Sequence, residues 1–161
     1  GADNGMTFGG YGNLYVPSYF SGRVLKYNGT TAAYIGIFAT VARPRVIIFR
    51  GNDVLISSET ANTVRRHDLL TGAFLGNLVS TNVRTPIGMA IDTDGSLYVA
   101  SSGDNRIGQF NATTGAYIRD FATAAQGVSL PAFITVISAP SPGSALVMAL
   151  SAAALASRRR R

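Results

Sequence analysis

The stretch PIGMAIDTDGSLYVAS, residues 86–101, contains two short apolar runs separated by the polar residues Asp92 to Gly95. An Asp-Gly pair between two such runs is typical of a β-hairpin, because the turn needs a positive φ that glycine adopts readily. The chain then passes through a second apolar and polar alternation at Asn105-Arg106-Ile107 and reaches another turn signal at Thr114-Gly115. This segment therefore predicts four short strands in succession.

The same pattern occurs three times in the chain. Leu14, Val54 and Leu97 occupy equivalent positions and are 40 and 43 residues apart. Each copy also has an Asn or Asp six residues before an aromatic residue, in the pairs Asn28 and Tyr34, Asp68 and Phe74, and Asn111 and Tyr117. Four strands in every ~40–45 residues are typical of a β-propeller blade. The alternative is one β-sandwich whose segments are similar by chance, but turns, hydrophobic positions and spacing agree together.

We therefore predict an all-β fold, with a β-propeller fragment of about three four-stranded blades over residues 1–137 and a short apolar C-terminal helix. Residues 131–136 predict the first strand of a further blade. Closed propellers normally have ~4–8 blades, so we expect the chain to lack N-terminal blades. The hairpin Gly95 to Val99, the strand Asn105-Arg106-Ile107 and the Thr-Gly turn resemble NHL repeats over roughly residues 5–123. That resemblance implies blades of the NHL type.

The composition favours a folded β-rich protein and excludes several other classes. Hydrophobic residues make up 47% and charged residues 14% of the chain, which argues against disorder. The net charge of +6 owes much to four terminal arginines, so we expect no nucleic-acid partner. Cysteine is absent, which excludes disulfides, zinc fingers of the Cys type and a Cys nucleophile.

The C-terminal part differs from the repeats. Residues 138–144 form a Pro/Ser/Gly linker with Pro140 and Pro142, and residues 145–161 comprise an apolar stretch, expected to be helical, and a basic end. The basic end consists of Arg158, Arg159, Arg160 and Arg161. This three-part layout resembles a PEP-CTERM sorting signal, although Ser141 stands where that motif has Glu. The resemblance implies an exosortase-like transpeptidase as partner, transient membrane anchoring by the C-terminus, and export to the cell envelope or the extracellular space. The alternative is an ordinary C-terminal helix with a solvated basic end.

Few residues suggest chemistry. His67 is the only histidine and Glu59 the only glutamate, so we predict no catalytic residues, no metal site and no cofactor. We expect His67 to occupy a half-exposed strand position, aligned with Tyr27 and Gln109.

We expect binding at the surface formed by the loops between second and third strands and those between blades. The candidate binding residues there are Tyr19, Arg43, Glu59, Arg84 and Asp104. Arg43 and Arg84 stand just ahead of Pro44 and Pro86, so we expect both guanidiniums to point the same way and to bind an acidic polysaccharide or protein.

The leading hypothesis is a non-enzymatic binding or scaffold module of the cell envelope or extracellular matrix, delivered by an exosortase-like system. The alternative is a propeller hydrolase or lyase, gluconolactonase-like or hydroxyglycine-lyase-like, whose active residues lie in missing N-terminal blades. Several central His or Glu residues in such blades would favour the enzyme.

Overall fold

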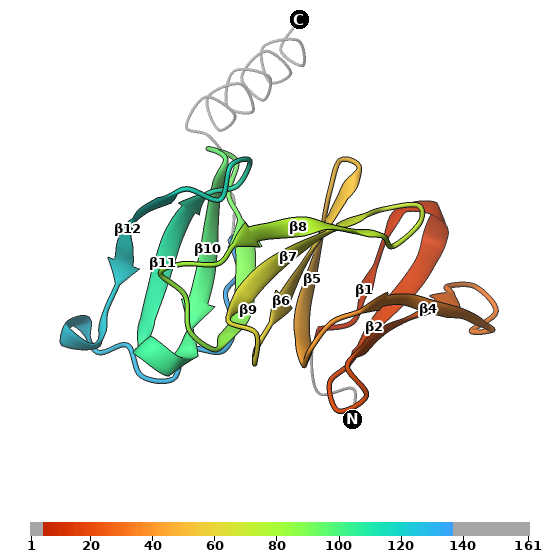
Figure 1. Cartoon of the computed structure of the whole chain (residues 1–161), viewed down its shortest axis with the longest axis horizontal. Helices are drawn as coiled ribbons and strands as arrows, with labels where there is room; N and C mark the ends of the chain where they lie inside the picture. The colour runs from red at the N-terminus through yellow and green to blue at the C-terminus, as the bar shows by residue number, and fades with distance from the viewer. Residues whose placement is uncertain (1–4, 137–161) are drawn as a thin grey trace, which may run out of the picture.

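The structure is a computed structural model that describes residues 5–136. These residues form three four-stranded antiparallel sheets, and the strands of each sheet follow one another in chain order (Figure 1). The predicted linker with Pro140 and Pro142, the apolar helix over residues 145–156 and the arginines 158–161 lie outside the described residues. The prediction of an all-β fold is confirmed for the described part of the chain.

Each sheet is one copy of the sequence repeat. Sheet 1 contains β1 (Thr7–Phe8), β2 (Asn13–Ser18), β3 (Arg23–Asn28) and β4 (Tyr34–Thr40). Sheet 2 contains β5 (Pro44–Arg50), β6 (Asp53–Ser58), β7 (Thr63–Asp68) and β8 (Phe74–Val79). Sheet 3 contains β9 (Pro86–Ile91), β10 (Ser96–Ser101), β11 (Arg106–Asn111) and β12 (Tyr117–Ala122). Three short 3₁₀ turns complete the described elements: Gly10–Gly12, Ser102–Asp104 and Ala124–Gln126.

The three sheets share one strand register. Leu14, Val54 and Leu97 each take the second position of a second strand and pair with the fifth residue of the third strand. The third and fourth strands are joined by the same two register shifts in every sheet. The equivalence that the 40- and 43-residue spacings predict is therefore confirmed.

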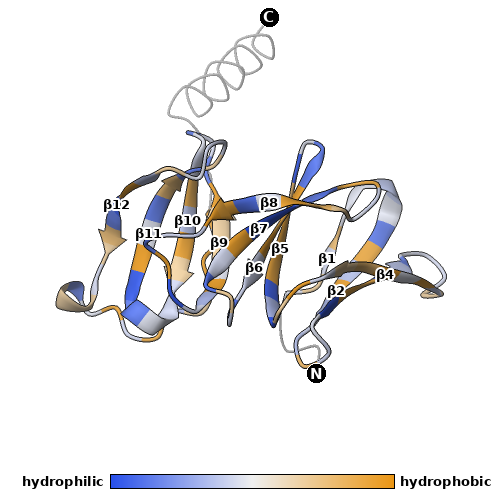
Figure 2. Ribbon diagram, in the orientation of Figure 1, coloured by the Kyte–Doolittle hydropathy of each residue, from blue (hydrophilic) through white to orange (hydrophobic). Residues whose placement is uncertain are grey.

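The core lies between the sheets, which stand side by side (Figure 1). We call the interface of sheets 1 and 2 seam 1; its buried members include Tyr15, Val24, Phe38, Ile47, Val54 and Ile56. We call the interface of sheets 2 and 3 seam 2; its buried members include Leu55, Val64, Leu78, Met89, Leu97 and Val99. Figure 2 shows the apolar residues recurring along the strands of all three sheets. Fully burying one such side chain contributes about 1.5–3 kcal/mol, so the seams hold the array together.

A glycine sets the spacing at each seam. Gly72 and Gly115, at the turns before the fourth strands, have φ values of 72° and 73°. A Cβ on Gly72 would lie 1.9 Å from the carbonyl oxygen of Phe38, and one on Gly115 would lie 1.7 Å from that of Leu78. The turn of one sheet thus contacts the outer strand of the sheet before it so closely that no side chain fits. The equivalent residue of sheet 1 is Ala32, also with a positive φ of 57°.

Residues 131–136 do not form the predicted strand. They do lie beside the first strand of sheet 3, because a Cβ on Gly88 would be 2.5 Å from the carbonyl oxygen of Ala132. A strand needs a neighbour with which to exchange backbone hydrogen bonds. Among the described residues no further second strand is present to pair with this segment, which accounts for the wrong prediction.

Candidate binding site at the loop rim

The candidate residues lie at one end of the sheets, where loops between second and third strands meet the connections between sheets. We call this end the loop rim. The backbone N–H of Glu59 donates to the carbonyl oxygen of Arg43 at 3.1 Å, and the N–H of Ser102 donates to the carbonyl oxygen of Thr85 at 3.2 Å. Each connection between sheets is thereby hydrogen-bonded to the loop between second and third strands that follows it. These backbone bonds fix the positions from which the side chains of the rim extend.

Three of the predicted residues meet at seam 1. The Tyr19 hydroxyl donates to Glu59 Oε1 at 2.8 Å and accepts a hydrogen bond from Arg43 Nη1 at 2.6 Å. These residues come from the β2–β3 loop, the β6–β7 loop and the connection between β4 and β5. Since they lie 16 or more positions apart in the chain, only the packing of sheet 1 on sheet 2 brings them together.

Arg45, which the sequence analysis did not single out, completes this group. Its guanidinium forms an ion pair with Glu59 Oε2 and lies 4.2 Å from the centre of the Tyr19 ring. Arg45 is the second residue of β5, two positions after Arg43. The sequence carries no signal for its contact with Tyr19, because that contact depends on the packing of two sheets. We refer to Tyr19, Arg43, Arg45 and Glu59 as the Tyr19 cluster.

The cluster has a buried base and an exposed top. Tyr19 is only 7% exposed, and the side chains of Arg45 and Glu59 are 21% and 14% exposed. Arg43 is exposed, and its guanidinium lies 4.8 Å from the Tyr19 ring and 6.0 Å from that of Phe20. The Phe20 ring is 72% exposed and stands edge-on to Tyr19 at 4.9 Å. A cation and an apolar ring therefore face solvent side by side.

Electrostatics keep the exposed arginine charged. The hydrogen bond with the Tyr19 hydroxyl is the main reason that the pKa of Arg43 is raised above its ordinary value. Glu59 is bonded to Tyr19 and Arg45 instead. Arg43 thus presents its remaining N–H donors to an approaching anion, and a planar guanidinium suits a carboxylate well.

Arg84 and Asp104 lie at seam 2, apart from the Tyr19 cluster. The backbone N–H of Arg84 donates a hydrogen bond of 2.7 Å to Ser101 Oγ. The Ser101 hydroxyl in turn donates one of 2.9 Å to Asp104 Oδ2. Asp104 also pairs with Arg106 at 3.4 Å, and Arg106 contacts Asp120 at 2.8 Å. The carboxylates of this second group are committed to Arg106, so it resembles a structural network more than an open site.

The expectation that Arg43 and Arg84 point the same way is wrong. The residues directly before the prolines are Arg43 and Thr85, and both have a positive φ, 47° and 50°. Arg84 corresponds instead to Ala42, since Ser58 Oγ lies 2.7 Å from the carbonyl oxygen of Ala42 and Ser101 Oγ lies 3.0 Å from that of Arg84. Arg84 thus stands one position away from the place that Arg43 takes, although both residues are exposed. An arginine directly ahead of a strand-opening proline is therefore not repeated within residues 5–136.

His67 is buried, not half-exposed. It is 2% exposed and corresponds to Tyr27 and Phe110, each of which packs on the aromatic residue that opens the fourth strand. Its Nδ1 lies 2.9 Å from the carbonyl oxygen of Gly72, and its Nε2 has no hydrogen-bond partner among the described residues. Burial is the main cause that lowers the pKa of His67 below 6.5. His67 is therefore a neutral core residue of seam 1.

Residues 5–136 offer neither a metal site nor a membrane-spanning helix. Clusters of three or more His, Asp or Glu side chains that could hold a metal ion do not occur there. Nor does that part of the chain contain a helix with the length and apolar character needed to cross a bilayer.

Comparisons with known proteins relate the chain to others through its fold only. No protein-family model and no curated protein matches the sequence. The computationally designed Ika4 protein is similar in structure, with a TM-score of 0.60 and 16% identity over 86% of this chain and 83% of that one. The designed Ika8 protein gives a TM-score of 0.58 and 16% identity, over 84% of this chain and 40% of that one.

A chain of a Nidogen/Laminin complex is also similar, with a TM-score of 0.67 and 14% identity over 78% of this chain and 49% of that one. This chain thus spans less than half the length of the second and third structures. At these identities the likeness concerns the arrangement of sheets alone.

Proposed function

We propose that the three sheets are blades of an NHL-type β-propeller and that the protein is a non-enzymatic binding module. The repeated register and the two seams support the propeller, because propellers are built from four-stranded sheets packed face to face around an axis. The Tyr19 cluster carries the proposal of binding. It is assembled from three separate loops, and its structure places Arg43 and Phe20 in solvent over a buried, hydrogen-bonded base.

An anionic polysaccharide is the ligand that this arrangement suits best. Arg43 would bind a carboxylate of the sugar, since a guanidinium offers two parallel N–H donors to its two oxygens. Phe20 would cover the apolar face of the same or the next ring. Glu59 neutralises Arg45 in the base, so the exposed charge that remains at the cluster is the positive charge of Arg43.

Binding to polygalacturonate, with neutral dextran as the comparison, tests this function. We expect Arg43→Ala and Phe20→Ala each to weaken binding about tenfold, as removal of one interface anchor commonly does. Arg66→Ala is the matched control: it removes an equal charge from the opposite end of sheet 2, where Arg50 still pairs with Asp53. An equal loss in the control, or equal binding of dextran, would show that the cluster is not the site.

We also propose that the module is exported to the cell envelope or extracellular matrix and handled by an exosortase-like transpeptidase. The support is the order of Pro140-Ser141-Pro142, the apolar residues 145–156 and the arginines 158–161 in the sequence. Basic flanks resist translocation, so the arginines would remain in the cytoplasm while the sheets lie outside.

Intact mass and cell fractionation test the proposed delivery. Changing Pro140 and Pro142 to Ala should leave an uncleaved, membrane-held form, whereas changing the four arginines to Ser should release more protein to the medium. Exported wild-type protein whose mass still includes Arg161, and which washes freely off cells, would contradict the proposal.

A further inference from the structure

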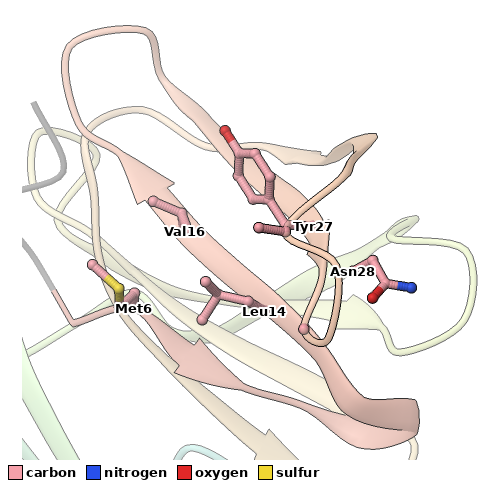
Figure 3. A pocket seen from close by; sticks show the side chains of 7 residues that line it. Met6, Leu14, Val16, Tyr27 and Asn28 are labelled. Atoms are coloured by element: carbon pink, nitrogen blue, oxygen red, sulfur yellow. The ribbon is translucent and has the colours of Figure 1, made fainter.

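The face of sheet 1 that points away from sheet 2 is apolar and open. Leu14 and Val16 are the equivalents of Val54 and Ile56 in sheet 2 and of Leu97 and Val99 in sheet 3. Those four equivalents are each 0% exposed, because the preceding sheet covers them. In sheet 1 the same positions line a hollow of about 330 Å³ together with Met6, Tyr27 and Ala32 (Figure 3).

The opposite end of the array carries the side chains that fill such a hollow. In seam 1, Tyr15 and Phe38 stand edge to face at 4.9 Å and pack on sheet 2. Tyr98 and Phe121 are their equivalents in sheet 3 and keep the same arrangement at 4.9 Å. Phe38 is 8% exposed whereas Phe121 is 48% exposed. The outward face of sheet 3 thus repeats, uncovered, the aromatic pair that seam 1 buries.

We propose that two copies of the chain associate head to tail, the Tyr98–Phe121 pair of one packing on Leu14 and Val16 of the other. The partner is argued from continuity with the seams inside the chain: the aromatic pair is the one that covers Val54 and Ile56 in seam 1, and Leu14 and Val16 are their equivalents. The two surfaces are different, so the contact is heterologous and leaves one free face of each kind in every dimer. Further copies add until the ring closes or the array stops.

Ala32 weakens this contact. Its equivalents Gly72 and Gly115 leave less than 2 Å between an added Cβ and the outer-strand carbonyl of the preceding sheet. Phe121 is the equivalent of Phe38, so its carbonyl would meet the methyl group of Ala32 in an identical seam. The contact between copies must therefore open at its outer edge, which makes the association reversible.

Sedimentation velocity of the full chain over a concentration series tests the proposal. We expect Val16→Asp alone and Phe121→Ser alone each to sediment as monomers, whereas an equimolar mixture forms a one-to-one dimer. The mixture recovers one contact because Val16→Asp keeps the aromatic pair and Phe121→Ser keeps the hollow. Met6→Asp also places a charge in the hollow and should have the same effect as Val16→Asp. Met6 is 56% exposed, so this change leaves the buried core of the strands intact.

Each other outcome overturns the proposal. Wild-type protein that stays monomeric at all concentrations would contradict it, and so would single variants that still associate. A mixture that stays monomeric while wild type associates would indicate a contact of like faces. Ala32→Gly should tighten association by about tenfold, as relief of one steric clash commonly does; unchanged association would show that the contact does not resemble the internal seams.

Discussion

The side-chain oxygen of Asn62 accepts a hydrogen bond of 2.7 Å from the backbone N–H of Thr85, in the next repeat. The side-chain oxygen of Asn105 likewise accepts a hydrogen bond of 2.9 Å from the backbone N–H of Leu130. Both asparagines have left-handed backbone, with φ of 54° and 51°, a conformation that Asn tolerates better than most residues. Sheet 1 has Gly22 at this position, with φ of 66° and no side chain to make the bond. The loop of one sheet therefore holds the segment of chain that follows that sheet in two of the three copies.

Asn62→Ala should lower the free energy of unfolding by about 1.5–3 kcal/mol, since it removes the bond to Thr85 and places in left-handed backbone a residue that tolerates this conformation less well than Asn. Asn62→Gly removes only the bond and should cost about 1 kcal/mol. Urea denaturation of the two variants measures both values. Equal losses would mean that the backbone conformation contributes nothing at this position.

Gly72→Ala should be the more destabilising of two glycine substitutions with nearly the same φ. Gly95 has φ of 82° and no atom within 4 Å of an added Cβ, so its change to Ala costs about 1–2 kcal/mol from conformation alone. At Gly72 the added methyl group also meets the Phe38 carbonyl, which adds about 1–3 kcal/mol of overpacking. Thermal or urea unfolding of both variants checks the difference, and equal losses would contradict the close contact at seam 1.

Stability should fall as the pH drops below 6.5. Burial lowers the pKa of His67 in the folded protein, so the unfolded chain binds the proton more readily and acid favours unfolding. The stabilising effect of the neutral imidazole is complete above 6.5 and is lost as pH falls toward the lower pKa of the folded state. His67→Phe places at this position the residue that sheet 3 has there, Phe110, and should remove this part of the pH dependence. The free energy of unfolding is measured from pH 7.5 to 4.5, a window around the ordinary His pKa of about 6.5. An unchanged profile in the variant would assign the pH dependence of stability to other groups.

Tyr19→Phe should weaken polygalacturonate binding severalfold, because Arg43 loses its hydrogen bond while both stacking rings remain. The variant should lose about 1–3 kcal/mol of stability, because it removes the two hydrogen bonds of the hydroxyl, with Glu59 and with Arg43. Tyr27→Phe is the control for a hydroxyl removed elsewhere. Full binding by Tyr19→Phe would mean that Arg43 needs no positioning by the tyrosine.

The repeat was predictable because its signals are local. Turn residues and alternating apolar residues mark Leu14, Val54 and Leu97 as equivalent, and each is a strand residue in the same register. What one strand cannot reveal is which of its faces a neighbouring sheet covers. His67 was misplaced for that reason, and the unpaired residues 131–136 for the related reason that a strand depends on its neighbour.

The candidate site was predictable in part. Tyr19, Arg43 and Glu59 lie in loops that the repeat assigns to one end of the sheets, and they do meet there. Arg84 was misjudged because it stands two residues ahead of Pro86, whereas Arg43 stands directly ahead of Pro44. Arg45 was missed because its role depends on the packing of two sheets, which spacing within one strand does not specify.

The arrangement of the seams has a consequence for local opening of the chain. Sheet 2 takes part in both seams, while sheets 1 and 3 each take part in one. Fluctuations that detach an end sheet break one set of contacts, but exposing the amides of β6 requires both neighbours to separate. Five of the six residues of β6 are buried, more than in any other described strand but β10. Amide hydrogens there should exchange with solvent most slowly, and protection should decline toward β1 and β12.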